Sequence, residues 1–110
     1  MSEYYLRHDP YNFDTQEDFE QFDYESNCSE IIKHHGFRNQ QLKLVEECAE
    51  LIRAIIRNDN ENFKEEVADV LVLIDQFMQN DSGFEFKVNE IKQEKVEREI
   101  GRIKHNEQTK

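Results

Sequence analysis

Five carboxylates lie among some of the most apolar residues in the central stretch of this 110-residue sequence. Glu46 and Glu47 are followed by Glu50, and Glu66 is followed by Asp69. Residues three positions apart lie on one face of an α-helix, about one turn from each other. Charged groups are costly to bury unless something neutralises them, so the pattern raises the question of what that partner is.

The two carboxylate pairs belong to helices that we expect to run antiparallel. The short segment "NDNEN" at residues 58–62 separates them and supplies both a turn and a candidate helix cap. The facing ExxE and ExxD pairs would bring four negative charges together, and these charges require compensation. Mg²⁺ is the natural counterion because it prefers carboxylate oxygens and keeps coordination positions for water and substrate phosphates.

A solvated acidic face is the simpler interpretation of any single ExxE pattern. The positions of these pairs argue against it, because Asp69 lies inside the apolar run "VADVLVLI". Ala49 and Ala68, one within each pair, are small and leave room between the helices. A di-iron centre requires Glu-x-x-His motifs, and neither pair includes a histidine.

Hydrophobic periodicity predicts an all-α fold, an antiparallel four-helix-bundle-like domain that is oligomeric. The 3 glycines and 1 proline provide few helix breakers. Residues 67–78 are apolar on nearly all sides, which in a short chain implies cover from a partner subunit. The expected helices run from Ser26 or Ser29 to His35 and over residues 37–57, 61–79 and 86–104.

The composition narrows the class of protein. With 36% hydrophobic and 35% charged residues, the chain fits one domain with a modest core and favours oligomerisation. A net charge of −11 argues against direct contact with nucleic acid, and no apolar run approaches the roughly 18 residues of a membrane helix. The N-terminus lacks the pattern of a secretory signal, and Cys28 and Cys48 form no CxxC motif, so we expect a reduced, cytoplasmic setting.

Charge is unevenly distributed along the chain. Residues 1–35 hold 9 acidic against 2 basic residues, whereas residues 84–110 hold 6 against 7, so of these two segments only the C-terminal one offers cations to an anionic ligand. We expect an acidic, aromatic arm at residues 1–27, with one helical turn near Gln16–Phe22, and a helical domain at residues 28–110. The arm is either loosely ordered or docked on its own bundle or on a neighbouring subunit.

The motifs "QLKLVEECAELIRAI" and "EEVADVLVLI" resemble those of the MazG-type all-α nucleoside triphosphate pyrophosphohydrolases, within the MazG and dimeric dUTPase-like superfamily. The family signature is EExxE, a gap, and ExxD. This chain has EExxE at residues 46–50 and ExxD at residues 66–69, with 15 residues between them. The resemblance covers about residues 35–104. It implies a helical bundle, assembled as a homodimer or homotetramer, that hydrolyses a nucleoside triphosphate, (d)NTP, to (d)NMP and pyrophosphate with Mg²⁺, or with Mn²⁺ as a substitute.

The resemblance also implies roles for individual residues. Glu47, Glu50, Glu66 and Asp69 would be metal ligands, and Glu46 with Glu47 would supply the catalytic carboxylates. The other expected contacts are a phosphate site at Lys43, Lys95, Arg98 and Arg102 and a base site at Phe37, Gln40 and Gln41. The family usually carries an Asn after the basic residue in its tail, and this sequence lacks it.

Two other interpretations of the carboxylates stay open. An acidic helical adaptor without catalysis would use them only as surface charge, and Asp69 in its apolar run argues against this. A nucleotide-binding regulator would keep the fold and the metal site but lack catalysis. Lys95, Arg98 and Arg102 share one face of the predicted C-terminal helix. This face would be an ordinary solvated surface if these cations pair with Glu94 and Glu99.

Overall fold

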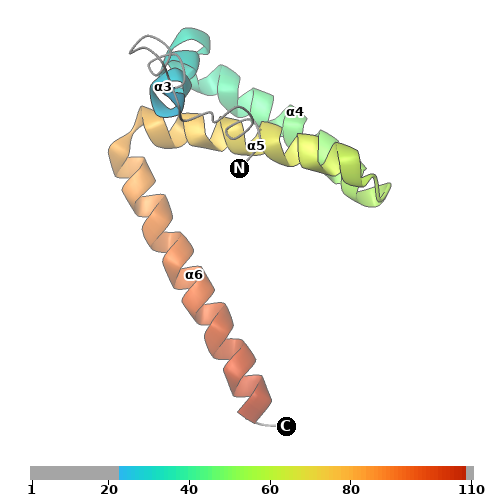
Figure 1. The fold of residues 1–110 in the computed structure, drawn as a ribbon. Coiled ribbons are helices and arrows are strands. Elements are labelled where there is room, and N and C mark those ends of the chain that lie inside the picture. Colours follow the sequence, from blue (N-terminus) through green and yellow to red (C-terminus); the bar gives the residue numbers. More distant parts are fainter. Residues whose placement is uncertain (1–22, 109–110) are drawn as a thin grey trace, which may run out of the picture.

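The computed structural model describes residues 23–108, and within this range the chain is entirely helical apart from short connections (Figure 1). The all-α prediction is therefore confirmed. The predicted helical turn near Gln16–Phe22 lies outside the described residues. In chain order the helices are α3 (Tyr24–His35), α4 (Phe37–Ile56), α5 (Asn60–Asn80) and α6 (Ser82–Gln108).

Helix α3 begins earlier than the sequence pattern predicts. Asp23 is its N-cap, and the Asp23 carboxylate accepts a hydrogen bond from the backbone N–H of Ser26 at 3.2 Å. The prediction that Ser26 or Ser29 caps this helix is therefore wrong, because an aspartate three residues upstream already satisfies the free N–H. The helix ends at Gly36, as expected, where a φ of 96° favours glycine.

Helices α4 and α5 form an antiparallel hairpin, as predicted, and run side by side in Figure 1. Asn58 in the connection has a φ of 55°, a left-handed conformation that asparagine tolerates better than most residues. Asp59 then caps α5 by accepting a hydrogen bond from the backbone N–H of Asn62 at 3.1 Å. This tight connection brings the acidic faces of the two helices together.

The core is small and is centred where α3 crosses α5. Its buried apolar side chains come from three helices, and the hydroxyl of Tyr24 donates a hydrogen bond to the Asp75 carboxylate at 2.6 Å, which joins α3 to α5. Phe37, at the start of α4, meets Phe77 edge to face with ring centroids 5.4 Å apart. The buried apolar residues are Cys28, Ile32, Ala54, Leu73 and Phe77.

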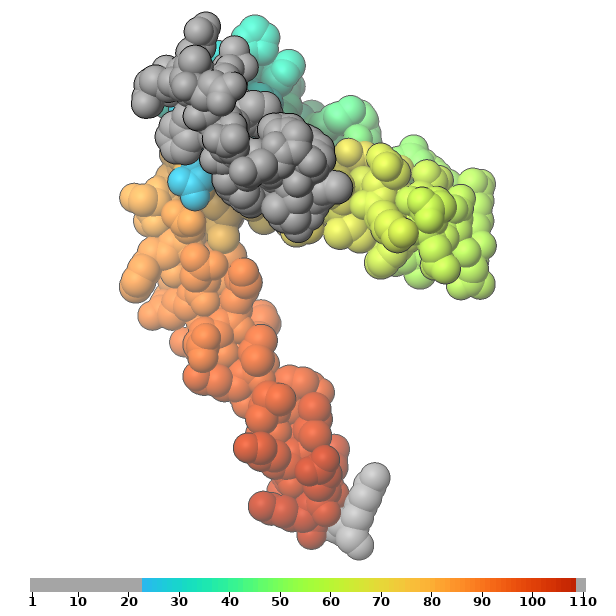
Figure 2. Space-filling view, viewed as in Figure 1, coloured from blue at the N-terminus to red at the C-terminus, as the bar shows by residue number. Residues whose placement is uncertain are grey.

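Helix α6 projects away from the other three helices (Figures 1 and 2). The carboxylate of Asp81 accepts hydrogen bonds from the backbone N–H groups of Gly83 and Phe84, so a new helix starts directly after α5 ends. Every residue from Asn89 to Gln108 is exposed. The radius of gyration is 18.2 Å, against about 13 Å for a compact domain of this size.

The extended α6 leaves apolar surface uncovered in a single chain. Val96 is 62% exposed on this helix, and Leu71 is 52% exposed in the segment of α5 that the sequence predicts to be covered by a partner. No helix within residues 23–108 has the length and apolar character needed to cross a membrane. The exposed apolar residues of α6 are Phe84, Phe86, Ile91, Val96, Ile100 and Ile103.

Candidate functional site

Three of the four predicted metal-ligating carboxylates come together between α4 and α5. Glu47 on α4 and Glu66 and Asp69 on α5 each offer an oxygen, and these oxygens lie within 4.8 Å of one another. The arrangement follows from the hairpin, because antiparallel helices place the ExxE face of α4 against the ExxD face of α5. We call these three residues the carboxylate cluster.

Glu66 is the least favourably placed member of the carboxylate cluster. Its Oε1 atom is inaccessible to solvent and has no hydrogen-bond partner among the described residues. Loss of hydration raises the pKa of Glu66, and the negative charges of Asp69 and Glu47 raise it further. A buried carboxylate oxygen without a partner, next to two further carboxylates, is a donor set that suits a hard divalent cation.

The other two predicted carboxylates lie beside the carboxylate cluster and are paired on the surface of α4. Glu50 forms an ion pair with Arg53 at 2.5 Å, and its side chain is half exposed. Its charge still contributes to the raised pKa of Glu66, so it lies close to the cluster. Glu46 is 71% exposed and lies 3.8 Å from the ammonium group of Lys43. Both side chains can therefore reorient at little cost, since exposed ion pairs are weak.

Asp69 is exposed, and the interpretation that its apolar neighbours bury it is wrong. Ala68 is exposed as well. The buried side chains of α5 come later along the helix, at Leu73, Gln76 and Phe77, where α3 covers α5. At Asp69 the helix faces the opening between α4 and α5, where no other described helix covers it.

A groove of about 210 Å³ extends along the two helices from the carboxylate cluster. Glu47 and Asp69 line one end of it. At the other end Gln40 and Gln76 are both buried, and the Nε2 of Gln40 donates a hydrogen bond to the Oε1 of Gln76 at 2.8 Å. The side walls are Lys43, Val72 and Leu73.

Two of the predicted ligand contacts, Lys43 and Gln40, thus line the same groove as the carboxylates. The ammonium group of Lys43 lies 3.5 Å from the Glu47 carboxylate. Gln76 is the polar lining residue that the sequence did not single out. The signal for it was weak: a glutamine seven positions after Asp69, and therefore on the same helix face, inside an apolar run.

Phe37 and Gln41 line a different pocket, of about 450 Å³, on another face of α4. Phe37 is half exposed, so its ring is accessible. Gln41 accepts a hydrogen bond from the guanidinium of Arg38 at 3.2 Å. The neighbouring glutamines 40 and 41 therefore point into separate pockets, and only the first adjoins the carboxylate cluster.

The three predicted phosphate-binding cations of α6 lie far along the projecting helix. Lys95, Arg98 and Arg102 are exposed, and Arg102 donates a hydrogen bond to the Glu99 carboxylate at 3.0 Å. Helix α6 packs against α5, and only its start, at Phe84, also lines a pocket with residues of α4. The structure therefore does not bring these cations to the carboxylate cluster of their own chain.

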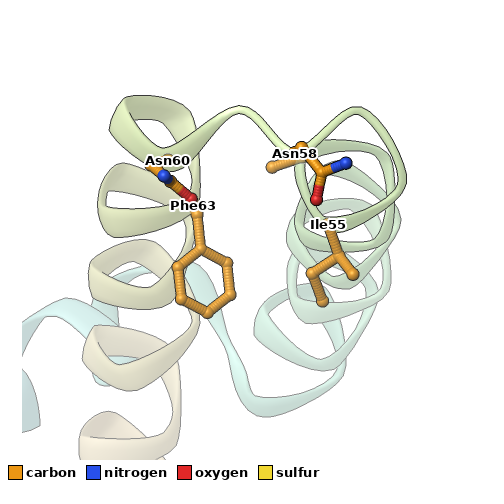
Figure 3. A pocket seen from close by; sticks show the side chains of 5 residues that line it. Ile55, Asn58, Asn60 and Phe63 are labelled. Atoms are coloured by element: carbon orange, nitrogen blue, oxygen red, sulfur yellow. The ribbon is translucent and has the colours of Figure 1, made fainter.

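A further pocket, of about 340 Å³, lies at the turn of the hairpin (Figure 3). Figure 3 shows the aromatic ring of Phe63 and the aliphatic side chain of Ile55 beside the amides of Asn58 and Asn60. None of its lining residues carries a titratable group, so it offers no acid–base or metal chemistry.

These features define an all-α domain in which two antiparallel helices present a carboxylate cluster at one end of a groove. The sequence matches the MazG nucleotide pyrophosphohydrolase domain family over residues 35–106, and the chain belongs to that family. No curated protein and no solved structure matches the chain significantly.

Proposed function

We propose that this chain is a Mg²⁺-dependent nucleoside triphosphate pyrophosphohydrolase that converts (d)NTP to (d)NMP and pyrophosphate. The observation that carries the proposal is the carboxylate cluster, which includes the buried, unpartnered oxygen of Glu66. Membership in the family supports a nucleotide as the substrate. The adjoining groove gives that nucleotide a place to lie.

Glu47, Glu66 and Asp69 would hold Mg²⁺, or Mn²⁺ in its place, and Glu50 can join them by leaving Arg53. When bound, the ion polarises phosphoryl oxygens and offsets the charge of the departing pyrophosphate. Glu46 is exposed next to Glu47, and its carboxylate can accept the proton of the attacking water. Water oxygen bonds to the α-phosphorus, and the bond to the α,β-bridging oxygen breaks.

Lys43 lies between the carboxylate cluster and the amide end of the groove. Its pairs with Glu46 and Glu47 measure 3.8 and 3.5 Å, and the lysine side chain is half exposed. Because such pairs are weak, Lys43 can exchange them for a phosphate oxygen of the substrate. This places the phosphates at the cluster and directs the sugar toward the buried glutamines.

We further propose that the working form is a homodimer or homotetramer. The exposed apolar stripe of α6 and the exposed Leu71 of α5 support this, because a second copy would cover both. In such an assembly α6 of a neighbouring copy can bring Lys95, Arg98 and Arg102 to the phosphates. Cys28 and Cys48 are both free thiols, which fits a reduced, cytoplasmic setting.

The test is pyrophosphate release from a panel of the eight common NTPs and dNTPs, with Mg²⁺ and with EDTA. We expect Mg²⁺-dependent release from at least one nucleotide. The Asp69→Asn variant should lose it by orders of magnitude, because metal binding and charge stabilisation weaken together. Absence of release from every nucleotide would reject the hydrolase and favour the adaptor or the nucleotide-binding regulator.

A further inference from the structure

One face of α6 continues an apolar pocket at the beginning of that helix. The pocket is lined mainly by apolar and aromatic residues of α4, together with Phe77 of α5 and Phe84 of α6. Phe37 and Phe84 are 50% and 44% exposed there, so the pocket is uncovered in a single chain. From Phe84, spacing by four and three residues leads along the same face of α6 to Val88 and Ile91.

The same face becomes basic further along the helix. Lys95, Arg98 and Arg102 continue the spacing by three and four, and all three are exposed. Of these cations only Arg102 has an ion-pair partner among residues 23–108, the Glu99 carboxylate. Arg38 adds a further cation at the pocket. This surface, which we call the basic face of α6, therefore suits an acidic segment that carries aromatic side chains.

The chain itself contains a segment of that composition, residues 1–22, which precedes the described part. It holds 6 acidic residues against 1 basic residue, and 6 aromatic residues. The described part begins next to Tyr24, whose hydroxyl is 2.6 Å from the Asp75 carboxylate. Asp75 lies five residues before Asn80, the end of α5, which corresponds to about 8 Å. The N-terminal segment is therefore joined to the domain close to the beginning of α6.

The length of the N-terminal segment is sufficient to reach the whole basic face. An extended chain spans about 3.3 Å per residue, so 22 residues reach about 70 Å. Helix α6 has 27 residues and is therefore about 40 Å long.

Charge favours the basic face over the exposed apolar surface of α5. Leu71 and Val72 are exposed on α5, but Asp69 and Asp75 flank them in the sequence and would repel an acidic segment. The apolar residues in the later part of α6 lie on another face, since each residue turns the helix by about 100°. A second copy can therefore cover those residues while the N-terminal segment occupies the basic face. These residues are Val96, Ile100 and Ile103.

We propose that the N-terminal segment docks on the basic face of α6 in its own chain, with aromatic side chains at the pocket and carboxylates on the cations. The docked segment competes with the nucleotide, because it occupies the cations that the proposed assembly presents to the phosphates. The competition rests on the proposed function, whereas the docking does not. The family match begins at residue 35, so the segment lies outside the matched domain.

Carbodiimide cross-linking tests the docking, because this reagent joins a carboxylate to a lysine amine that it contacts. In the full chain, mass spectrometry should find Lys95 joined to a carboxylate of the N-terminal segment. Lys64 is the matched control, since it is also exposed but lies on α5, and it should not be joined to that segment. Replacing Phe19 and Phe22 by serine keeps every carboxylate but removes two aromatic side chains, and this variant should lose most of the Lys95 cross-link.

A sample refolded from a mixture of unlabelled and ¹⁵N-labelled chains shows whether the cross-link lies within one chain. We expect cross-linked peptides that are wholly labelled or wholly unlabelled. Peptides that combine the two labels would mean that the segment docks on a neighbouring copy and would overturn docking on its own chain. Absence of any cross-link between Lys95 and the segment would overturn the docking altogether.

The competition is measured with inorganic tripolyphosphate and Mg²⁺, because this probe carries a triphosphate without a base or sugar. A variant with a neutralised segment should bind it about tenfold more tightly than the parent, as expected if the segment is docked about nine-tenths of the time. This difference should shrink at high ionic strength, which screens the exposed charges. The neutralised variant carries Asp14→Asn, Glu17→Gln, Asp18→Asn and Glu20→Gln.

The matched control removes four exposed carboxylates that lie off the basic face, and it should bind tripolyphosphate about as the parent does. An equal gain in the control would assign the effect to net charge and overturn the competition, as would equal affinities of the parent and the neutralised variant or no binding at all. The control carries Glu61→Gln, Glu90→Gln, Glu97→Gln and Glu107→Gln.

These measurements distinguish failure of this inference from failure of the proposed function. Pyrophosphate release from a nucleotide without the Lys95 cross-link would overturn the docked segment and leave the hydrolase in place. The cross-link within one chain, without hydrolysis of any nucleotide, would uphold the docking and reject the hydrolase. Neither cross-link nor hydrolysis would overturn both.

Discussion

Replacing Glu66 by glutamine probes the carboxylate cluster most sharply, because it keeps the shape of the side chain and removes one charge. Three carboxylates form three mutually repelling pairs, and Glu66 belongs to two of them. Its Oε1 has no hydrogen-bond partner among residues 23–108, so the substitution breaks no bond at that atom. We therefore expect Glu66→Gln to melt a few degrees higher than the parent in EDTA, while losing metal binding.

The stability difference between Glu66→Gln and the parent should depend on pH, because Glu66 titrates. Glu66 has a pKa above its ordinary value of 4.5 in the folded protein. Its ionisation therefore destabilises the folded state at neutral pH, and this cost disappears as the pH falls through the folded pKa toward 4.5. In EDTA the advantage of Glu66→Gln over the parent should be greatest near neutral pH and should vanish in mild acid.

Mg²⁺ should reverse the order of the melting temperatures of the parent and Glu66→Gln. Mg²⁺ at a hundredfold excess over its Kd should raise the melting temperature of the parent by roughly 10–20 °C, because it binds only the folded state. Glu66→Gln should gain much less. The control is Glu65→Gln, an adjacent exposed carboxylate that should respond to Mg²⁺ as the parent does. A Glu66→Gln variant that melts below the parent in EDTA and keeps the full response to Mg²⁺ would contradict a role for Glu66 in metal binding.

Three further predictions test the site, the core and the assembly. Asp69→Asn should hydrolyse the best nucleotide orders of magnitude more slowly than the parent, while its melting temperature in EDTA stays the same or rises. A variant that hydrolyses this nucleotide as fast as the parent would exclude Asp69 as a metal ligand. Ile32→Ala should destabilise the fold by about 2–5 kcal/mol in urea titration, because Ile32 is 1% exposed. Light scattering at micromolar concentration should give at least a dimer, and a well-folded monomer would contradict the proposed cover of α6.

The hairpin and its carboxylates could be predicted because local rules determine them. Apolar residues at three- and four-residue spacing identified α4 and α5, and the short connection forced them to be antiparallel. Spacing by three then placed Glu47, Glu66 and Asp69 between the helices. The tail helix was also predicted, but α6 starts at Ser82 rather than at 86, because Asp81 caps it directly.

Features that depend on distant contacts could not be read from the sequence. An apolar run around Asp69 suggests burial, but burial depends on whether another helix covers that position, and α3 covers α5 only further along. Gln76 gains its partner from Gln40, 36 positions earlier, which no local pattern reveals. The direction of α6 is set at the break near Asp81, so the distance of Arg98 from the carboxylate cluster of its own chain was not predictable either.

The position of bond cleavage decides whether this chain is a pyrophosphohydrolase. Phosphorus NMR of the best nucleotide with Mg²⁺ distinguishes the products of attack at the α-phosphorus from those of attack at the γ-phosphorus. We expect resonances of pyrophosphate and the nucleoside monophosphate to grow together and to be absent in EDTA. Formation of orthophosphate and the nucleoside diphosphate, or equal turnover in EDTA, would contradict a Mg²⁺-dependent pyrophosphohydrolase.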